Sequence, residues 1–151
     1  MRTRAGVVLI LDGKVALIER HRAGLHYYAF PGGGVDDGET PEEAAVREML
    51  EETGLQVALL QKLAIVHFRG NPQHYFLAER LSGEFGTGAG QEIRHPRPAD
   101  PDHGTHAPVW VPIEDLASGQ NVFPAHLAAL VFRSVTEGWP RSPIDVIENP
   151  K

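Results

Sequence analysis

The stretch from Gly33 to Leu55, GGVDDGETPEEAAVREMLEETGL, constrains this chain more than any other segment, because it specifies a helix and what that helix carries. Glu48, Glu51 and Glu52 stand at positions i, i+3 and i+4, which lie on one helical face with Cβ atoms about 5–6 Å apart. Three like charges held so close destabilise a helix unless a cation lies among them. Hard divalent cations prefer oxygen ligands, so the segment predicts a site for Mg²⁺ or Mn²⁺.

The limits of this helix can be predicted from its end residues. Thr40 is a good N-cap, Pro41 suits the first helical position, and Glu43 completes a capping box. Gly54 supplies a left-handed stop at the C-terminal end. The side of the helix expected to be buried, opposite the carboxylates, consists of Val46, Met49, Leu50 and Thr53.

Two neighbours of the glutamates make the segment more specific. Arg47 stands one residue before Glu48 and four before Glu51, so its guanidinium can steady a carboxylate. The turn Pro31–Gly34 contains three glycines, and without Cβ atoms its backbone can approach a ligand closely. A glycine carbonyl there can coordinate a metal, and the amides can receive phosphate oxygens. The alternative, a solvated acidic helix after a flexible loop, does not account for this ordered combination.

The segment resembles the signature box of the Nudix hydrolases, GX5EX7REUXEEXGU, in which U is an aliphatic residue. Every fixed position of that box is matched, by Gly33, Glu39, Arg47, Glu48, Met49, Glu51, Glu52, Gly54 and Leu55. The box covers 23 of the 151 residues, and the flanking segments YYAFPGGGVD and VWVPIEDL look similar too. The resemblance implies an α+β fold, an α/β/α sandwich with a mixed β-sheet between helices.

The same resemblance implies metal-dependent hydrolysis of a nucleoside diphosphate linked to another moiety. Its metal ligands, for Mg²⁺ or else Mn²⁺, would be Gly33 through its carbonyl, Glu48, Glu51 and Glu52. Glu39 and Arg47 would orient these carboxylates, and the general base stays open between a box glutamate and one on a later loop. The candidate catalytic residues are therefore Glu51, Glu52, Glu92 and Arg47.

This chemistry is physically consistent. A pyrophosphate bridge is densely anionic and would be repelled by bare carboxylates, whereas a bound cation reverses the local charge and stabilises charge that develops in the transition state. A bound cation also lowers the pKa of its water ligand, and a nearby glutamate acting as general base typically contributes about 10²–10⁴-fold.

The identity of the substrate is less constrained. A MutT-like enzyme acting on a nucleoside triphosphate or a related nucleotide is the preferred interpretation, with ADP-ribose and nucleotide sugars as competing substrates. A regulatory module that binds nucleotide without hydrolysing it is the other alternative. Weaker candidates for substrate contacts are Arg20 and Arg22, for phosphate or ribose, and Tyr28 and Phe30, for stacking on a base. Solvated arginines without a specific role and aromatic rings packed in the core are the preferred explanations of these four residues.

Composition excludes several other classes of protein. There are no cysteines, so disulfides, zinc thiolate sites and thiol catalysis are ruled out. The net charge of −6 argues against binding of long nucleic acids and leaves a small-molecule nucleotide as the expected partner. No apolar run reaches transmembrane length and no signal pattern precedes GVVLIL, so a cytoplasmic location is expected. Monomer and homodimer remain equally open.

The rest of the chain suggests one domain, residues 1–151. Strands are expected at 6–11, 14–19, 27–30, 56–68, 74–80 and 108–111, a loop at 20–24, and a second long helix at 121–137. The segment 82–107 is a long loop rich in glycine and proline that contains Glu92, either a substrate-facing lid or a surface insertion. Residues 141–151 are expected to form an irregular tail.

Overall fold

The computed structural model describes residues 2–87, 105–117 and 121–148. Its strands are β1 (Arg4–Leu11), β2 (Lys14–Arg22), β3 (Leu25–Ala29), β4 (Gly32–Gly34), β5 (Leu55–Phe68), β6 (Asn71–Gly83), β7 (Thr105–Pro112), β8 (Val122–Phe123) and β9 (Ile144–Glu148). Its helices are α1 (Pro41–Thr53), the short 3₁₀ helix η1 (Ile113–Ala117) and α3 (Ala125–Glu137). Within the described residues, no helix is long and apolar enough to cross a membrane.

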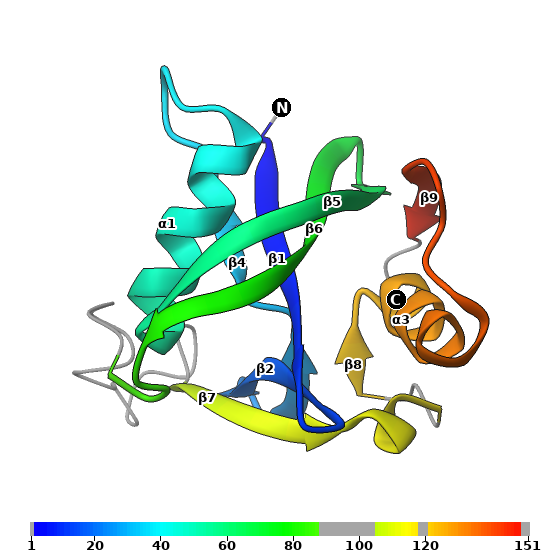
Figure 1. Ribbon diagram of the computed structural model, residues 1–151. Helices are drawn as coiled ribbons and strands as arrows, with labels where there is room; N and C mark the ends of the chain where they lie inside the picture. The colour runs from blue at the N-terminus through cyan, green and yellow to red at the C-terminus, as the bar shows by residue number, and fades with distance from the viewer. Residues whose placement is uncertain (1, 88–104, 118–120, 149–151) are drawn as a thin grey trace.

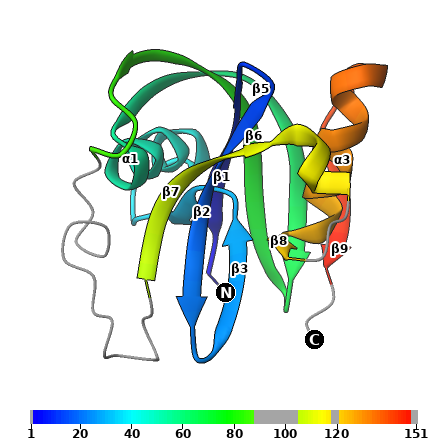
Figure 2. The ribbon, with the colours of Figure 1, turned by 90° about the horizontal axis from the view of Figure 1, so that it is seen from below.

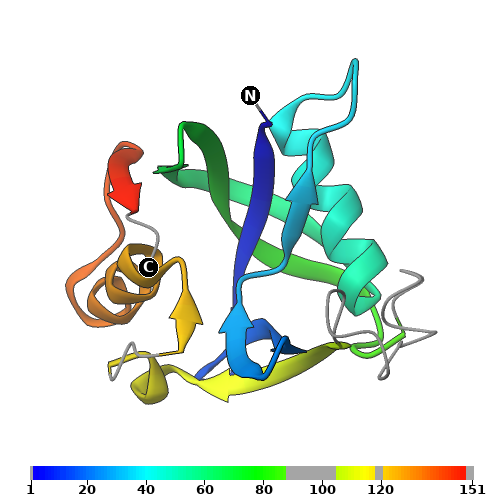
Figure 3. The same cartoon turned by 180° about the vertical axis from the view of Figure 1, so that it is seen from behind.

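The strands form one mixed sheet in the order β8-β3-β2-β1-β6-β5-β9, with β4 paired to β1 and β7 paired to β2. Pairing is parallel between β1 and β6, β3 and β8, and β5 and β9, and antiparallel elsewhere. Helices α1 and α3 lie on opposite sides of the strands (Figures 1 and 3). The expected α+β fold, with a mixed sheet between helices, is confirmed.

Strand β1 divides the core into two halves, because alternate side chains of a strand point to opposite faces. Ala5, Val7 and Leu9 pack in the half that contains α1, together with Ala44, Ala45 and Met49. Val8 packs in the other half, together with α3 through Leu127, Ala128, Leu130 and Val131. A strand that is buried on both faces has apolar residues at consecutive positions, which explains why the apolar residues of GVVLIL do not alternate with polar ones.

Helix α1 has the predicted ends. The Thr40 hydroxyl accepts a hydrogen bond from the Glu43 amide at 3.1 Å, and the Glu43 carboxylate accepts one from the Thr40 amide at 2.9 Å. Gly54 ends the helix at φ 85°. The predicted buried side was partly wrong, because Leu50 is 43% exposed while Ala44 and Ala45 are fully buried. These two alanines face β1, where short side chains let the helix lie close to the sheet.

The expected loop at residues 20–24 was also wrong, since β2 continues to Arg22 and β3 begins at Leu25. The connecting turn is only Ala23 and Gly24, both at positive φ (52° and 79°). Two such residues match the right-handed twist of flanking strands, so the hairpin is tight. Figure 2 shows β3, β2 and β7 side by side in this part of the sheet.

The second long helix begins at Ala125, four residues later than expected. The preceding residues belong to the sheet instead: the carbonyls of Asn121 and Phe123 accept hydrogen bonds from the amides of Tyr28, at 2.7 Å, and Phe30, at 3.2 Å. Backbone groups that pair with β3 cannot also make helical bonds, and Pro124 then occupies the N-cap position.

The expected irregular tail is replaced in part by β9, which pairs in parallel with the edge of β5. Glu148 at its end is buried, and its carboxylate accepts hydrogen bonds from the Ala125 amide at 3.0 Å and the His126 amide at 3.3 Å. The tail is therefore tied to the sheet and to the start of α3. The segment 82–107 is also shorter than expected at both ends, because β6 runs to Gly83 and β7 begins at Thr105.

Candidate active site

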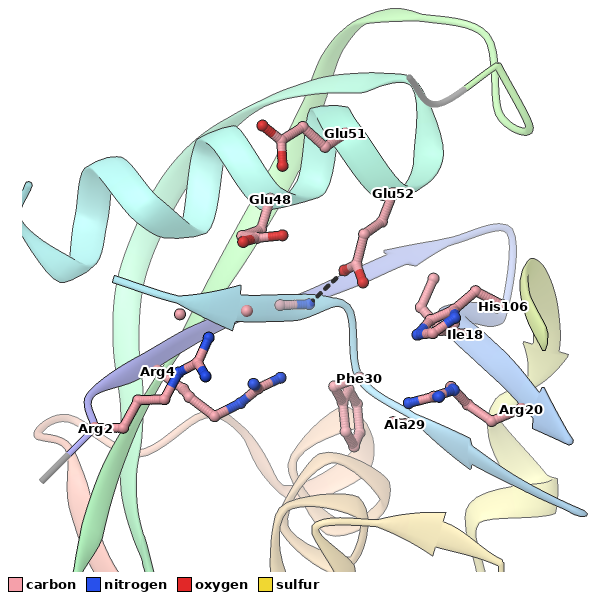
Figure 4. A pocket seen from close by; sticks show the side chains of 13 residues that line it. Arg2, Arg4, Ile18, Arg20, Ala29, Phe30, Glu48, Glu51, Glu52 and His106 are labelled. Carbon is pink, nitrogen blue, oxygen red and sulfur yellow. Dashed lines mark hydrogen bonds between the residues drawn. The ribbon is translucent and has the colours of Figure 1, made fainter. Parts of the chain in front are cut away.

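A cavity of about 360 Å³ lies between α1 and the strands β1, β2 and β4 (Figure 4). Its lining combines three carboxylates, three guanidinium groups, three glycines and a smaller apolar part: Glu48, Glu51 and Glu52; Arg2, Arg4 and Arg20; Gly32, Gly33 and Gly34; Ile18, Ala29 and Phe30; and His106. The glutamates project from α1, and the glycine turn passes between them and the side chains of Arg2 and Arg4 (Figure 4). A basic wall thus faces an acidic one.

Arg47 joins the glycine turn to the acidic face of α1. Its guanidinium makes two parallel bonds to Glu39, from Nε to Oε2 at 2.8 Å and from Nη2 to Oε1 at 2.9 Å. Nη2 also donates to the carbonyl of Gly34 at 2.9 Å, while Nη1 donates to Glu48 at 3.1 Å and to Glu51 at 3.2 Å. One side chain therefore fixes two of the three cavity carboxylates relative to the turn.

The electrostatics of this pair match its geometry. The hydrogen bonds from Arg47 lower the pKa of Glu39 from 4.5 to about 2, helped by the bond from the Asp36 amide. The bonds to Glu39 in turn raise the pKa of Arg47 above its ordinary value. Each group therefore stabilises the ionised form of the other.

A side chain at either of two positions of the turn would disturb its surroundings. A Cβ at Gly33 would collide with the Glu48 carboxylate, and a Cβ at Gly32 would collide with the backbone of Ala5 on β1. The Gly32 amide donates a hydrogen bond of 2.6 Å to Glu52 Oε1, drawn as a dashed line in Figure 4. The absence of side chains thus lets the backbone come within contact of the carboxylates.

Two of the cavity carboxylates are held in surroundings that disfavour their negative charge. The pKa of Glu52 is raised to about 8, mainly by burial and to a smaller extent by the neighbouring Glu48, against the lowering effect of the bond from Gly32. Burial is also the main cause that raises the pKa of Glu48, against the lowering effect of Arg47. A cation bound by these carboxylate oxygens would stabilise the negative charge of both glutamates, so this donor set fits a divalent cation such as Mg²⁺.

The residues proposed from the sequence fall into three groups. The cavity brings together Gly33, Glu48, Glu51 and Glu52 with Arg20 and Phe30, and Arg47 lies directly behind it. Tyr28 lines a different cavity together with Glu19, and Arg22 is exposed at the end of β2. Glu92 lies outside the described residues.

Sequence reasoning missed Arg2, Arg4 and His106, which line the same cavity. A signal for the two arginines exists, because residues two apart in a strand point to the same face and MRTR leads directly into β1. No local signal marks His106, which reaches the cavity through the pairing of β7 with β2, where its partner is Arg20.

Sequence comparisons identify related proteins. The model of one protein family, described as the NUDIX domain, matches residues 1–131. A Bacillus subtilis (strain 168) protein named "Putative 8-oxo-dGTP diphosphatase" is 37% identical over 87 residues, 56% of this chain and 58% of that protein. An RNA pyrophosphohydrolase of Aeromonas hydrophila subsp. hydrophila is 50% identical over 81 residues, 53% of this chain and 43% of that protein. The chain spans about half the length of these curated relatives.

Solved structures share the fold. The MutT NUDIX hydrolase from Burkholderia pseudomallei superposes with a TM-score of 0.65 at 27% identity, covering 89% of this chain and 98% of that one. A NUDIX hydrolase from Nitrosomonas europaea superposes with a TM-score of 0.74 over 99% of this chain and 79% of that one, and at 17% identity this likeness concerns the fold alone.

Proposed function

Because the chain belongs to the NUDIX family, we propose that it hydrolyses a phosphoanhydride bond of a nucleotide with the help of a divalent cation. The observation that carries this proposal is the cavity in which Glu48, Glu51 and Glu52 face a wall of arginines. The three carboxylates suit a divalent cation, and the three arginines suit the phosphates to which that cation would be bound. A neutral ligand would leave the charges of both walls without partners.

The cation would be held by the three glutamates and the carbonyl of Gly33, and Mg²⁺ or Mn²⁺ fits this oxygen donor set. When bound, it would neutralise phosphate charge and lower the pKa of its water. Arg47 is a positioning residue, because it contacts Glu48 and Glu51 and lies behind the cavity lining. Its contacts would hold both carboxylates in place during substrate binding.

The opposite wall would bind the substrate. Arg4 and Arg20 are close enough to act electrostatically on Glu52, whose pKa both lower. Phosphate oxygens placed between these groups would receive charge-assisted hydrogen bonds from guanidinium donors. A glutamate would accept the proton of the attacking water. Glu51 or Glu52 is the preferred candidate for this general base, and Glu92 is the alternative. Phe30, buried beneath the turn and in edge contact with Tyr75, supplies an apolar floor.

We propose a nucleoside triphosphate or related nucleotide as the substrate, supported by the name of the Bacillus subtilis relative. The 5′-triphosphate end of an RNA is a second candidate, favoured by relatives at 46–50% identity that are named RNA pyrophosphohydrolases. ADP-ribose and nucleotide sugars remain alternatives, and so does binding without hydrolysis. A cytoplasmic location and a monomer or homodimer also stay predictions from the sequence.

A substrate panel tests the proposal. The full chain with Mg²⁺ is incubated with ATP, dGTP, 8-oxo-dGTP, ADP-ribose, a nucleotide sugar and a 5′-triphosphorylated RNA oligonucleotide, and the products are identified by chromatography. We expect cleavage of a triphosphate to a monophosphate product, with no turnover in EDTA and a loss of at least about 10²-fold in kcat for Glu52→Gln. Tight nucleotide binding without product under any divalent cation would instead support the regulatory module.

A further inference from the structure

A second group of metal-ligand side chains lies on the hairpin formed by β2 and β3. Glu19, His21 and His26 each offer one ligand atom, and these atoms all lie within 4.8 Å of one another. In the part of the chain that the structure describes, this is the only such group of three histidine or acidic side chains. Nothing in the proposed hydrolysis uses it.

The three donor atoms lie close together. The Nε2 atom of His26 lies 2.7 Å from Glu19 Oε2, and the Nε2 atom of His21 lies 3.7 Å from the same oxygen. In a tetrahedral zinc site, with bonds of about 2.0–2.2 Å, neighbouring ligand atoms are about 3.3–3.6 Å apart. The observed separations bracket that value, so one ion lies within reach of all three residues once the two imidazoles turn out of their parallel stack to direct their Nε2 lone pairs at it.

The fold arranges these residues before any ion binds. His21 and His26 are directly opposite in the β2–β3 register, and their rings stack with centroids 4.2 Å apart and planes 5° apart. Glu19 precedes His21 by two residues and therefore shares its face of the strand. The two-residue turn at Ala23 and Gly24 fixes this register, so the backbone positions of the three residues are already set and only their side chains must reorient on binding.

The carboxylate also has the support that metal-bound carboxylates usually have. The Tyr28 hydroxyl lies 3.5 Å from Glu19 Oε2, where it can donate a hydrogen bond to that carboxylate. His21 and His26 are 58% and 45% exposed, which leaves both imidazoles accessible to an ion from solution.

This group is separate from the candidate active site. Arg20, between Glu19 and His21, lines the active-site cavity, whereas Glu19 lines another cavity with Tyr28 and Asp115. Its chemistry also differs, because two imidazoles and one carboxylate favour Zn²⁺ or a similar transition metal over Mg²⁺.

We propose that Glu19, His21 and His26 bind one Zn²⁺ ion, or a transition-metal ion of the same preference, and that this ion ties β2 to β3. Water would complete the coordination, since three protein side chains supply three of four tetrahedral positions. The site is a clamp on the hairpin, and no reaction is assigned to it.

Calorimetric titration with ZnCl₂ tests this site in the full chain. All proteins carry Glu51→Gln and Glu52→Gln, which weaken the other metal site, and Mg²⁺ is present in excess. We expect one Zn²⁺ per chain, and an affinity at least about tenfold lower in His21→Gln/His26→Gln. The matched control is His67→Gln/His126→Gln, which removes two partly exposed histidines that each pair with only one carboxylate.

A second measurement identifies the ligands directly. In ¹⁵N NMR spectra of the parent protein, the imidazole resonances of His21 and His26 should both shift with one equivalent of Zn²⁺, while those of His67 and His126 stay in place. Equal zinc affinity in the parent and in His21→Gln/His26→Gln would overturn the proposal. So would an equal loss of affinity in the control pair, or shifts confined to other histidines.

Discussion

At the scale of single residues, Arg47 links several parts of the candidate site. Its guanidinium contacts Glu39, Glu48 and Glu51 and the carbonyl of Gly34, so four groups take their positions from one side chain. A planar fork with five donors can do this, whereas a lysine ammonium cannot bind one carboxylate through two parallel bonds.

Replacement of Arg47 by lysine tests this arrangement. We expect Arg47→Lys to lower kcat by about 10–10²-fold, since a displacement near 1 Å at a reacting centre has effects of that size, and to weaken the apparent affinity for Mg²⁺. Steady-state kinetics at several Mg²⁺ concentrations separate the two effects. Arg133→Lys is the control, because Arg133 lies on α3 away from the cavity. Equal kinetics for the two variants would show that Arg47 does not position the carboxylates.

Glu52 gives the cation-free chain a specific pH dependence. Its folded pKa of about 8 lies above the ordinary 4.5, so the protonated form favours folding. That contribution is complete below pH 4.5 and is lost as the pH rises through about 8. A cation must displace the proton, so Mg²⁺ affinity should rise by up to about tenfold per pH unit between pH 6 and pH 8.

Calorimetry in buffers of different ionisation enthalpy measures this coupling. At pH 7, Mg²⁺ binding should release a proton from the parent chain, whereas Glu52→Gln should bind Mg²⁺ more weakly and without that release. An unchanged proton release in the variant would assign the coupling to another group.

At the scale of elements, the chain uses its C-terminal strand to complete a helix. Pro124 makes no side-chain cap at the start of α3, and the Glu148 carboxylate at the end of β9 takes that role for the Ala125 and His126 amides. A carboxylate beside the first turn also complements the helix dipole.

We expect Glu148→Ala to lower the free energy of unfolding by about 1–2 kcal/mol, because a helix loses its cap and two amides lose their acceptor. For a chain of this size, that corresponds to a fall in Tm of about 2–8 °C in thermal unfolding followed by circular dichroism. Asp145→Ala is the matched control on the same strand, since its side chain is 74% exposed and should change the free energy by less than about 0.5 kcal/mol. Similar Tm values for the two variants would rule out the cap.

At the scale of the whole molecule, the cavity is assembled from parts that are distant in sequence. The acidic wall comes from α1, and the basic wall comes from β1, the residues just before it and β2, with His106 from β7 beside it. Ligands that bridge the two walls should therefore stabilise the folded chain as a unit.

Thermal unfolding with Mg²⁺ and a non-hydrolysable nucleoside triphosphate measures this linkage. At a ligand concentration of 100 Kd we expect about 2.7 kcal/mol of stabilisation, which is a rise in Tm of roughly 5–11 °C. EDTA should remove most of this rise, and Arg4→Gln should reduce it without affecting the stability of the ligand-free chain by more than about 1 kcal/mol. A rise that persists in EDTA would mean that the nucleotide binds without the cation.

The sequence by itself determined helix α1, its caps and the face that carries the glutamates. Each of these features depends on contacts between residues no more than four apart, so local spacing is enough to specify them. The close approach of the backbone in the turn Pro31–Gly34 could also be predicted from the sequence, because the missing Cβ of glycine is a property of the residue itself.

Only the tertiary structure decided that the arginines meet the glutamates across one cavity, that the pKa of Glu52 is raised, and that Glu148 caps α3. Each of these depends on strand register or on burial, as when β9 pairs with β5 across some 80 positions of sequence. Many partners compete for a strand over such distances, and the choice among them is made by the packing of the whole core. Local sequence carries no record of that choice.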